Sequence, residues 1–153
     1  AEDIGRYTSI AWPFTRAAAA ELIAAANADW AAGRAARFAI VLAAPGAPDL
    51  FAGTASLLHF YPERGDAEVG YWLGEAARGR GLTRRAVALL CDWALGPLGL
   101  RRLHLLVDLD NAASHAVARA CGFRPIGEQH WSHPPDPAKA AICLAYERLA
   151  DAV

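Results

Sequence analysis

The hydrophobic pattern of this chain changes abruptly at a glycine-rich segment, residues 74–81. Downstream of it, apolar residues from Leu82 to Trp93 recur at helical spacing, and this pattern ends at Gly96. Upstream of it, apolar runs of strand length are separated by short stretches with proline and glycine, which predicts strands at 37–43, 50–61 and 67–73. Strands joined by such short turns pair as antiparallel neighbours, so the chain must combine an antiparallel layer with helices.

The flanking segments extend this pattern to a single domain over residues 1–153. Thr15 is a suitable N-cap for an alanine-rich helix that ends at Gly33, and Gly53 marks a candidate bulge in the second strand. After Gly96 the pattern predicts a strand, a helix and two further strands, the last two separated by a proline-rich loop: 102–109, 111–122, 123–131 and 140–149. The fold class is therefore α/β (α+β), with one mixed, mostly antiparallel sheet covered by helices.

Composition and charge exclude several classes of protein. With 55% hydrophobic and 20% charged residues the chain is globular, and no apolar run approaches the roughly 18 residues that span a bilayer. A net charge of −1 provides no general drive toward nucleic acid or an anionic membrane, so neither is expected as a partner. No secretory signal is visible, and the widely spaced cysteines suit neither a disulfide framework nor a zinc site. We expect a cytoplasmic protein without metal, and the preference for Arg over Lys with abundant Ala points to a bacterial source.

The segment from Arg78 to Thr83 is the first candidate binding site, because a predicted strand runs here into a glycine-rich loop that opens a helix. Such a loop directs several backbone N–H groups at one point, and the helix N-terminus adds about half a positive charge. Together they can hold a phosphate or pyrophosphate. The segment is neither a dinucleotide fingerprint nor a P-loop. An ordinary turn before a helix is the competing interpretation.

The same segment resembles motif A of the GNAT superfamily of N-acetyltransferases, whose pattern is Gln/Arg-x-x-Gly-x-Gly/Ala. Here the motif is Arg78-x-x-Gly81-x-Thr83. Thr83 departs from the family pattern, since its branched side chain stands where the family has a small residue. Its hydroxyl can donate to a phosphate, or the loop can lie slightly further from the phosphate.

A second set of residues is similar to one branch of that family, the ribosomal-protein N-terminal acetyltransferases. The strand Glu68–Leu73 looks like the corresponding strand of the branch, and Asn111-x-x-Ser114 followed by Gly122 looks like its Asn-x-x-Ser…Gly-Phe segment. The resemblance extends over residues 37–131. By analogy with the family, a first strand and first helix are missing or cut short at the N-terminus of this chain.

The resemblance implies that helices cover both faces of the sheet and that its central strands splay apart where coenzyme A binds. It implies transfer of an acetyl group from acetyl-CoA to a primary amine, with both substrates bound together. Of the arginines near the loop, which include Arg84 and Arg85, at most two are expected to meet the 3′-phosphate. Asn111 is expected to cap its helix and to touch the pantetheine arm. The cofactor-binding residues implied are Tyr71, Trp72, Leu73, Arg78, Gly79, Arg80, Gly81, Leu82, Thr83 and Asn111.

Two residues are predicted to be catalytic. Glu68, on the strand leading to the thioester, can deprotonate the incoming amine directly or through water. A solvated carboxylate or an ion-pair partner is the competing interpretation, and the competing bases are His59, His115 and His130. Ser114 is the candidate proton donor to the departing thiolate, because Ala118 stands where many family members have a tyrosine. A helical serine bonded to the carbonyl one turn earlier is its alternative role.

The acceptor is expected to be a small molecule or a protein or peptide N-terminus, and large aromatics are candidates for lining its pocket: Trp12, Trp30, Tyr71, Trp72 and Trp131. Three alternatives stay open from the sequence. The chain could be a CoA-binding module without catalysis, or a transferase that uses another donor such as succinyl-CoA. A nucleic-acid binder using the Arg84 cluster is disfavoured by the balanced charge. A homodimer is one option for the oligomeric state.

Overall fold

The computed structural model describes residues 2–10, 12–43, 46, 48–61, 63–131 and 141–151. Four α-helices and six strands follow one another along this part of the chain, with one short 3₁₀ turn, η1, between β3 and α3. Their bounds are α1 Glu2–Tyr7, α2 Arg16–Ala31, β1 Ala36–Leu42, β2 Leu50–Tyr61, β3 Asp66–Leu73, η1 Glu75–Ala77, α3 Leu82–Leu95, β4 Arg102–Asp108, α4 Ala112–Ala120, β5 Arg124–Trp131 and β6 Ala141–Leu149. The predicted order of strands and helices is confirmed.

Local sequence signals explain most of these boundaries. The Thr15 hydroxyl accepts a hydrogen bond from the Ala18 backbone N–H at 3.1 Å and so caps α2, as expected for a threonine before a helix. Gly53 lies beside a register shift between β1 and β2, where a bulge was predicted. A side chain at Gly53 would place its Cβ only 2.1 Å from the Trp72 carbonyl oxygen, so β2 and β3 can approach here only at a glycine.

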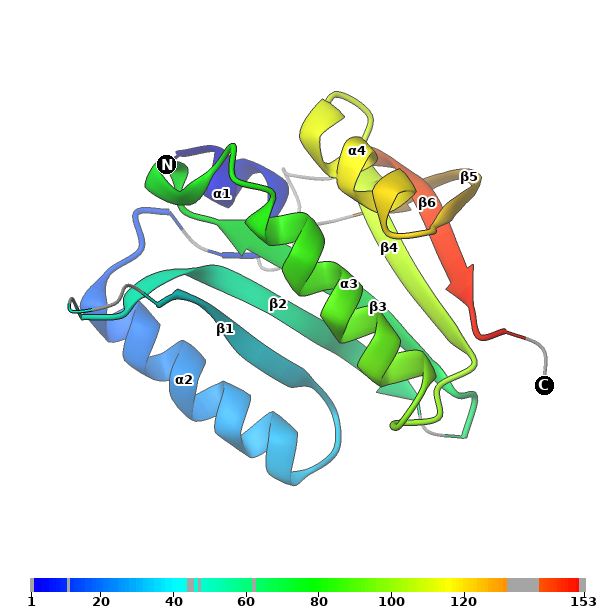
Figure 1. Cartoon of the computed structure of the whole chain (residues 1–153), viewed down its shortest axis with the longest axis horizontal. Helices are drawn as coiled ribbons and strands as arrows, with labels where there is room; N and C mark the ends of the chain where they lie inside the picture. The colour runs from blue at the N-terminus through cyan, green and yellow to red at the C-terminus, as the bar shows by residue number, and fades with distance from the viewer. Residues whose placement is uncertain are drawn as a thin grey trace.

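The strands form one sheet in the order β1-β2-β3-β4-β6-β5. Every neighbouring pair is antiparallel except β3 and β4, which are parallel and are connected through α3. Figure 1 shows α3 and α4 on the same face of the sheet, with α2 alongside the edge strand β1. The N-terminal half of α2 also borders the opposite face of the sheet, where Leu22 lines a cavity together with Arg37 and Thr54. The predicted mixed, mostly antiparallel sheet is confirmed.

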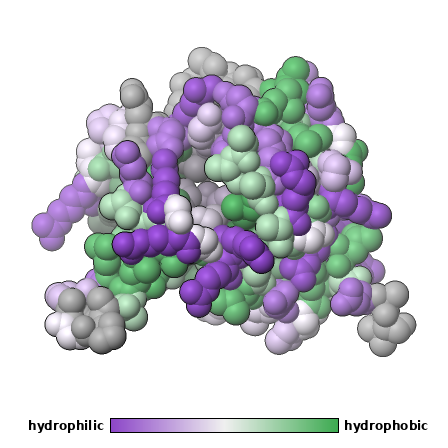
Figure 2. Space-filling view, turned by 45° about the horizontal axis from the view of Figure 1, so that its top comes forward, coloured by the Kyte–Doolittle hydropathy of each residue, from purple (hydrophilic) through white to green (hydrophobic). Residues whose placement is uncertain are grey.

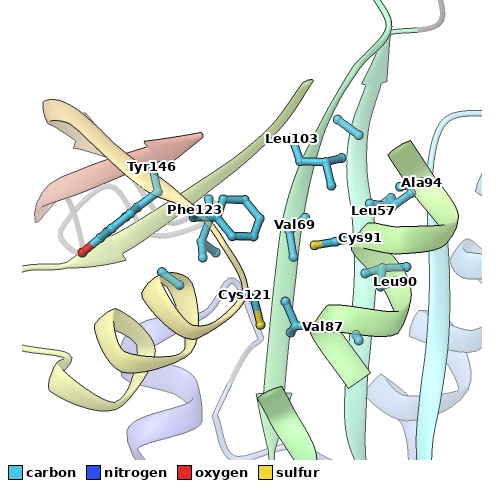
Figure 3. Close-up of a cluster of buried hydrophobic side chains, with 14 of the residues drawn as sticks. Leu57, Val69, Val87, Leu90, Cys91, Ala94, Leu103, Cys121, Phe123 and Tyr146 are labelled. Atoms are coloured by element: carbon cyan, nitrogen blue, oxygen red, sulfur yellow. The ribbon is translucent and has the colours of Figure 1, made fainter. Parts of the chain in front are cut away.

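The hydrophobic core lies between the sheet and the helices α3 and α4. Burial alternates along β4, where Leu103, Leu105 and Val107 are buried and the residues between them are partly exposed. These buried side chains share one hydrophobic cluster with Val87 and Cys91, which are fully buried on α3, and Figure 3 shows Leu103 of β4 in the same cluster as these two residues. The core thus fixes which face of β3 and β4 turns toward the helices and which face stays available for a site.

The parallel pair β3–β4 is short. Its residues pair only from Asp66 to Glu68 on β3, opposite residues 102–104 on β4, and beyond this point the two strands separate. Both strands continue outward, β3 paired with β2 and β4 paired with β6. The predicted splay of the central strands is therefore present, and it opens toward the start of α3 and α4.

Several sequence predictions stand outside these observations. The proline-rich loop before β6 and the side chain of Trp131 lie outside the described residues. Two helices, α1 and α2, precede β1. That a first strand and first helix of the family are missing or cut short in this chain stays a prediction. Within the described part of the chain, no helix combines the length and apolar character required to cross a membrane.

Candidate active site

A cleft runs through the sheet at the point where β3 and β4 separate. On the face covered by α3, which we call the loop side, it is lined by the glycine-rich loop and the start of α3. On the opposite face, which we call the Glu68 side, it is lined by Glu68 and by residues of β1 and β2. The residues common to both sides mark the passage between them: Tyr7, Thr8, Tyr71, Trp72, Asn111 and Ser114. Of these, only the four on β3 and near α4 were predicted from the sequence.

The loop side has the backbone geometry of an anion site. Gly79 and Gly81 have φ values of 75° and 68°, a region that side chains other than glycine rarely adopt. Gly81 is also the N-cap of α3, and it has no side chain to accept from the first-turn N–H groups. These N–H groups and the positive end of the helix dipole face the cleft, where Leu82 and Thr83 contribute to the lining. The loop therefore fits a phosphate group.

Arg78 is tied to the protein at both ends of its guanidinium group. Its Nε donates to the Leu73 carbonyl oxygen at 3.1 Å, and one Nη donates to Asp3 of α1 at 2.6 Å. Hydrogen bonding to Arg78 lowers the pKa of Asp3 below its ordinary value. Arg78 thus braces the end of β3 and remains at the edge of the cleft. Arg80 is exposed and does not line the cleft, whereas Arg84 does.

In Figure 2 the loop side of the molecule is turned forward, and many hydrophilic side chains gather over it. A second contact from α1 is the ion pair between Arg6 and Asp110, just before α4. Together with the Asp3–Arg78 pair, it holds α1 between the glycine-rich loop and the start of α4. The sequence offered no signal for this arrangement, because the pairs join residues far apart along the chain.

Asn111 and Ser114 lie at the start of α4, as predicted, and both line the cleft. The Asn111 side-chain oxygen accepts a hydrogen bond from the Ser114 backbone N–H at 3.1 Å, so Asn111 caps the helix. The Ser114 carbonyl oxygen accepts from the Tyr71 hydroxyl at 3.4 Å. Among the described residues, the Ser114 hydroxyl has no hydrogen bond to another side chain, and it is available to a molecule in the cleft.

Tyr71 and Trp72 project to opposite faces of β3 and both reach the passage. Burial raises the pKa of Tyr71 to about 12, so its hydroxyl is neutral at ordinary pH. Trp72 stacks edge-on against Phe51 at 5.7 Å between ring centroids. Trp30 was also a candidate for lining the acceptor pocket, and it does not line the cleft. It contacts Phe38 of β1 and lies in an apolar groove away from the cleft.

Glu68 is the acidic residue at the point where the β3–β4 pairing ends. Its side chain is only 22% exposed, and this burial raises the pKa of its carboxyl group, partly offset by the neighbouring His59. A carboxylate with a raised pKa is a better proton acceptor than a free one. Glu68 therefore has both the position and the environment of a general base.

The competing histidines differ in their surroundings. The two ring nitrogens of His115 lie 2.9 Å from the Tyr146 hydroxyl and 3.3 Å from the Leu109 carbonyl oxygen, which makes His115 a structural anchor of α4. His130 is exposed on β5. His59 lies beside Glu68, with 3.9 Å between Nε2 and Oε2. Of the three, only His59 lies close to the predicted base.

Asp108 is a residue that the sequence reasoning missed. It ends β4, lines the Glu68 side of the cleft, and accepts a hydrogen bond from the Cys143 thiol at 2.9 Å. Burial, together with Asp108, raises the pKa of Cys143 to about 12, so this sulfur is a thiol and not a thiolate. An aspartate at the end of an apolar strand gives no distinctive pattern, and the residue that contacts it is 35 positions away. The three cysteines are free and buried.

Comparison with known proteins agrees with this geometry. Residues 1–124 match the family model described as the acetyltransferase (GNAT) domain. The N-acetyltransferase p20 of Bacillus licheniformis is 30% identical over 126 residues, which is 82% of this chain and 68% of that protein.

Two solved structures show the same fold at lower identity. The ribosomal-protein-S5-alanine acetyltransferase of Vibrio fischeri is 21% identical, with a TM-score of 0.73 over 90% of this chain and 74% of its own. The ribosomal L7/L12 alpha-N-protein acetyltransferase RimL, solved in complex with coenzyme A, is 22% identical, with a TM-score of 0.71 over 87% and 72% of the two chains. The chain therefore belongs to the GNAT family of N-acetyltransferases.

Proposed function

We propose that this protein transfers an acetyl group from acetyl-CoA to a primary amine, with both substrates bound at the same time. The observation that carries the proposal is the cleft that passes from one face of the sheet to the other. One mouth has a phosphate-binding loop and the other has a buried carboxylate. A linear cofactor and an amine can therefore approach each other from opposite faces of the sheet.

The residues on the loop side fit the groups of coenzyme A. The N–H groups at the start of α3 suit the pyrophosphate, and the glycines at 79 and 81 allow close approach. Past Glu68, no strand among the described residues pairs with β3 on its β4 side, and this edge suits the amides of the pantetheine arm. Because the Leu73 carbonyl oxygen is already bonded to Arg78, Tyr71 and Trp72 are left as the main contacts on this strand. Acetyl-CoA would supply an activated acyl group.

Glu68 and Ser114 provide two of the proton transfers that the reaction requires. Glu68 takes a proton from the acceptor ammonium, so that the amine nitrogen can attack the thioester carbonyl carbon. As the carbon–sulfur bond breaks, Ser114 gives its hydroxyl proton to the thiolate, and the second proton that the nitrogen loses as the amide forms passes through water to Ser114 and restores its hydroxyl. Ser114 lines the passage between the two sides, and Glu68 lies on the Glu68 side, from which the acceptor would enter. This is the arrangement that the two steps need.

The acceptor that we propose is the amino terminus of a protein or peptide. The two solved relatives described above are named for ribosomal proteins, and the Glu68 side is bordered by open surface along β2 and β4. Such a surface can take an extended chain whose first residue enters the cleft.

The test is a screen of acetyl-CoA against peptide N-termini, a polyamine and an aminoglycoside, with release of free thiol and the mass of the product as readouts. Calorimetry with coenzyme A alone is run in parallel. We expect binding of coenzyme A and acetylation of at least one amine. Binding without transfer to any amine would favour the noncatalytic module, and absence of binding would exclude both functions. The same amines are then tried with succinyl-CoA, and faster transfer from succinyl-CoA would correct the donor.

A further inference from the structure

Strand β2 contains a bulge directly opposite the predicted base. Leu58 pairs with Glu68 and Tyr61 pairs with Asp66, so two residues of β2 face one residue of β3. The extra residue is His59, whose φ is 47°. It is the only described residue other than glycine with a positive φ.

The bulge decides which way His59 faces. In a regular strand, successive side chains alternate, and His59 would lie on the face opposite to Leu58. Here, instead, Phe60 packs against the hydrophobic core, and His59 lines a cavity on the same face as Glu68. The Phe60 backbone N–H donates to the Arg34 carbonyl oxygen at 3.2 Å, which holds the bulge in place. The irregularity thus brings an imidazole beside the carboxylate.

A histidine at this position carries a conformational cost. The left-handed region is unfavourable for residues with a side chain, and a bulge of this kind ordinarily has glycine there. A strained residue of this type is common at functional sites, where its side chain is needed in a particular place. The strained backbone at His59 places its imidazole beside Glu68, with 3.9 Å between Nε2 and Oε2.

The pair differs sharply in exposure. Glu68 is 22% exposed, whereas His59 is 66% exposed, and 3.9 Å separates His59 Nε2 from Glu68 Oε2. His59 therefore lies between a partly buried carboxylate and bulk water. Other charged or titratable groups face the same cavity from the turn and from the neighbouring strands: Tyr61, Arg64, Asp66, Arg102 and His104. Asp66 is paired with Arg102 at 2.8 Å, which leaves His59 as the ion-pair partner beside Glu68.

We propose that His59 is a positioning residue that holds the Glu68 carboxylate and carries away the proton taken from the acceptor amine. This inference rests on the proposed function. The acceptor ammonium gives its proton to the Glu68 carboxylate, the Glu68 carboxyl gives it to the imidazole, and the imidazolium releases it to water. No other bond changes, and Glu68 returns to the carboxylate before the next turnover.

The first experiment needs no acceptor. It follows the titration of the Glu68 side-chain carboxyl carbon by NMR in the full-length protein without ligand. His59→Asn keeps a residue that tolerates the left-handed region but removes the imidazole. Since His59 lowers the pKa of Glu68 and burial raises it, the midpoint should move to higher pH in this variant. The matched control is His104→Asn on β4, which should leave the midpoint unchanged. An unchanged midpoint in His59→Asn would overturn the pairing.

The second experiment follows acetyl transfer with an amine that the wild type uses. In His59→Asn, kcat should fall about 10-fold with little change in the KM for acetyl-CoA, and the acidic limb of the rate profile should move to higher pH. His59→Gly should raise the midpoint of thermal unfolding, since glycine adopts this φ without strain, yet it should be as slow as His59→Asn. Wild-type rates in both variants would overturn the role in transfer. If the wild type acetylates no amine, the proposed function is overturned and the role of His59 in transfer falls with it. The NMR titration would still report on the pairing of His59 with Glu68.

Discussion

Glu68 stands on β3 with most of its side chain removed from water, and its pKa is raised for that reason. A solvated carboxylate at the end of a strand, which the sequence left open, would lack this desolvation. The raised pKa has a cost at low pH, because a base must be deprotonated to act. The rate of transfer should therefore fall as the pH drops through the raised pKa of Glu68, at a pH above that of an ordinary carboxylate.

Replacement of Glu68 tests its role as a base. Glu68→Gln keeps the shape of the side chain but cannot take a proton, so kcat at neutral pH should fall by about 10²- to 10⁴-fold. Rates should recover in part at high pH, where the free amine is abundant. Calorimetry should show nearly unchanged binding of coenzyme A, since Glu68 lies on the opposite side of the cleft. A variant with the wild-type pH–rate profile would exclude Glu68 from the mechanism, and Asp108, which lines the same side, would become the better candidate.

Ser114 is tested through the leaving group. Ser114→Ala should slow transfer from acetyl-CoA by about 10- to 1,000-fold with little change in affinity, because a thiolate gains from a proton as it leaves. A thioester whose thiol has a much lower pKa needs no such proton, so wild type and variant should then converge in rate. Tyr71→Phe serves as the comparison, because its hydroxyl also reaches the passage. A rate gap that persists with the better leaving group would reduce Ser114 to a positioning role.

The element that we propose as the phosphate site is the junction between the glycine-rich loop and α3. A helix of 14 residues begins here at a glycine without a capping side chain, so its first N–H groups are free to meet a ligand. If the loop were only an ordinary turn before a helix, the junction would not need to line a cleft. In the structure the junction lines the cleft.

Two substitutions at Gly81 separate charge from backbone strain. No atom lies within 4 Å of a Cβ built at Gly81, so both alanine and aspartate have space, and both have the same unfavourable φ. Gly81→Ala should lose about 1 kcal/mol of stability and bind coenzyme A more weakly by a small factor. Gly81→Asp adds a negative charge at the phosphate site, and calorimetry should show a loss of about 100-fold or more in affinity relative to Gly81→Ala. Equal affinities in the two folded variants would place the phosphates elsewhere.

In the proposed function, the molecule as a whole presents the two faces of one sheet to two different substrates. The cleft between β3 and β4 connects them, so the acyl group can pass directly from donor to acceptor. A covalent acyl-enzyme would need an activated nucleophile in the passage. The three cysteines do not line it, and burial raises the pKa of each thiol, which disfavours the reactive thiolate. Ser114 lines the passage, but no described side chain is hydrogen-bonded to its hydroxyl as a base.

Direct transfer predicts a distinct kinetic pattern. Initial rates measured at several fixed amine concentrations should give intersecting double-reciprocal lines, because both substrates must be bound before reaction. Mass spectrometry of the protein mixed with acetyl-CoA alone should show no acetylated enzyme. Parallel lines together with a burst of free thiol in the absence of amine would instead indicate a covalent intermediate.

The helices, the strands and the glycine-rich loop before α3 could be predicted from the sequence alone. Caps at Thr15 and Asn111, the glycines at 79 and 81, and the apolar periodicity are local signals, readable from a few neighbouring residues. Which side chains meet across the fold follows from the tertiary structure. The bulge that turns His59 toward Glu68, the Asp3–Arg78 pair and the Cys143–Asp108 contact join residues brought together by strand pairing and packing. Such contacts leave no periodic trace along the chain, because their energy depends on partners that only the folded sheet brings within reach.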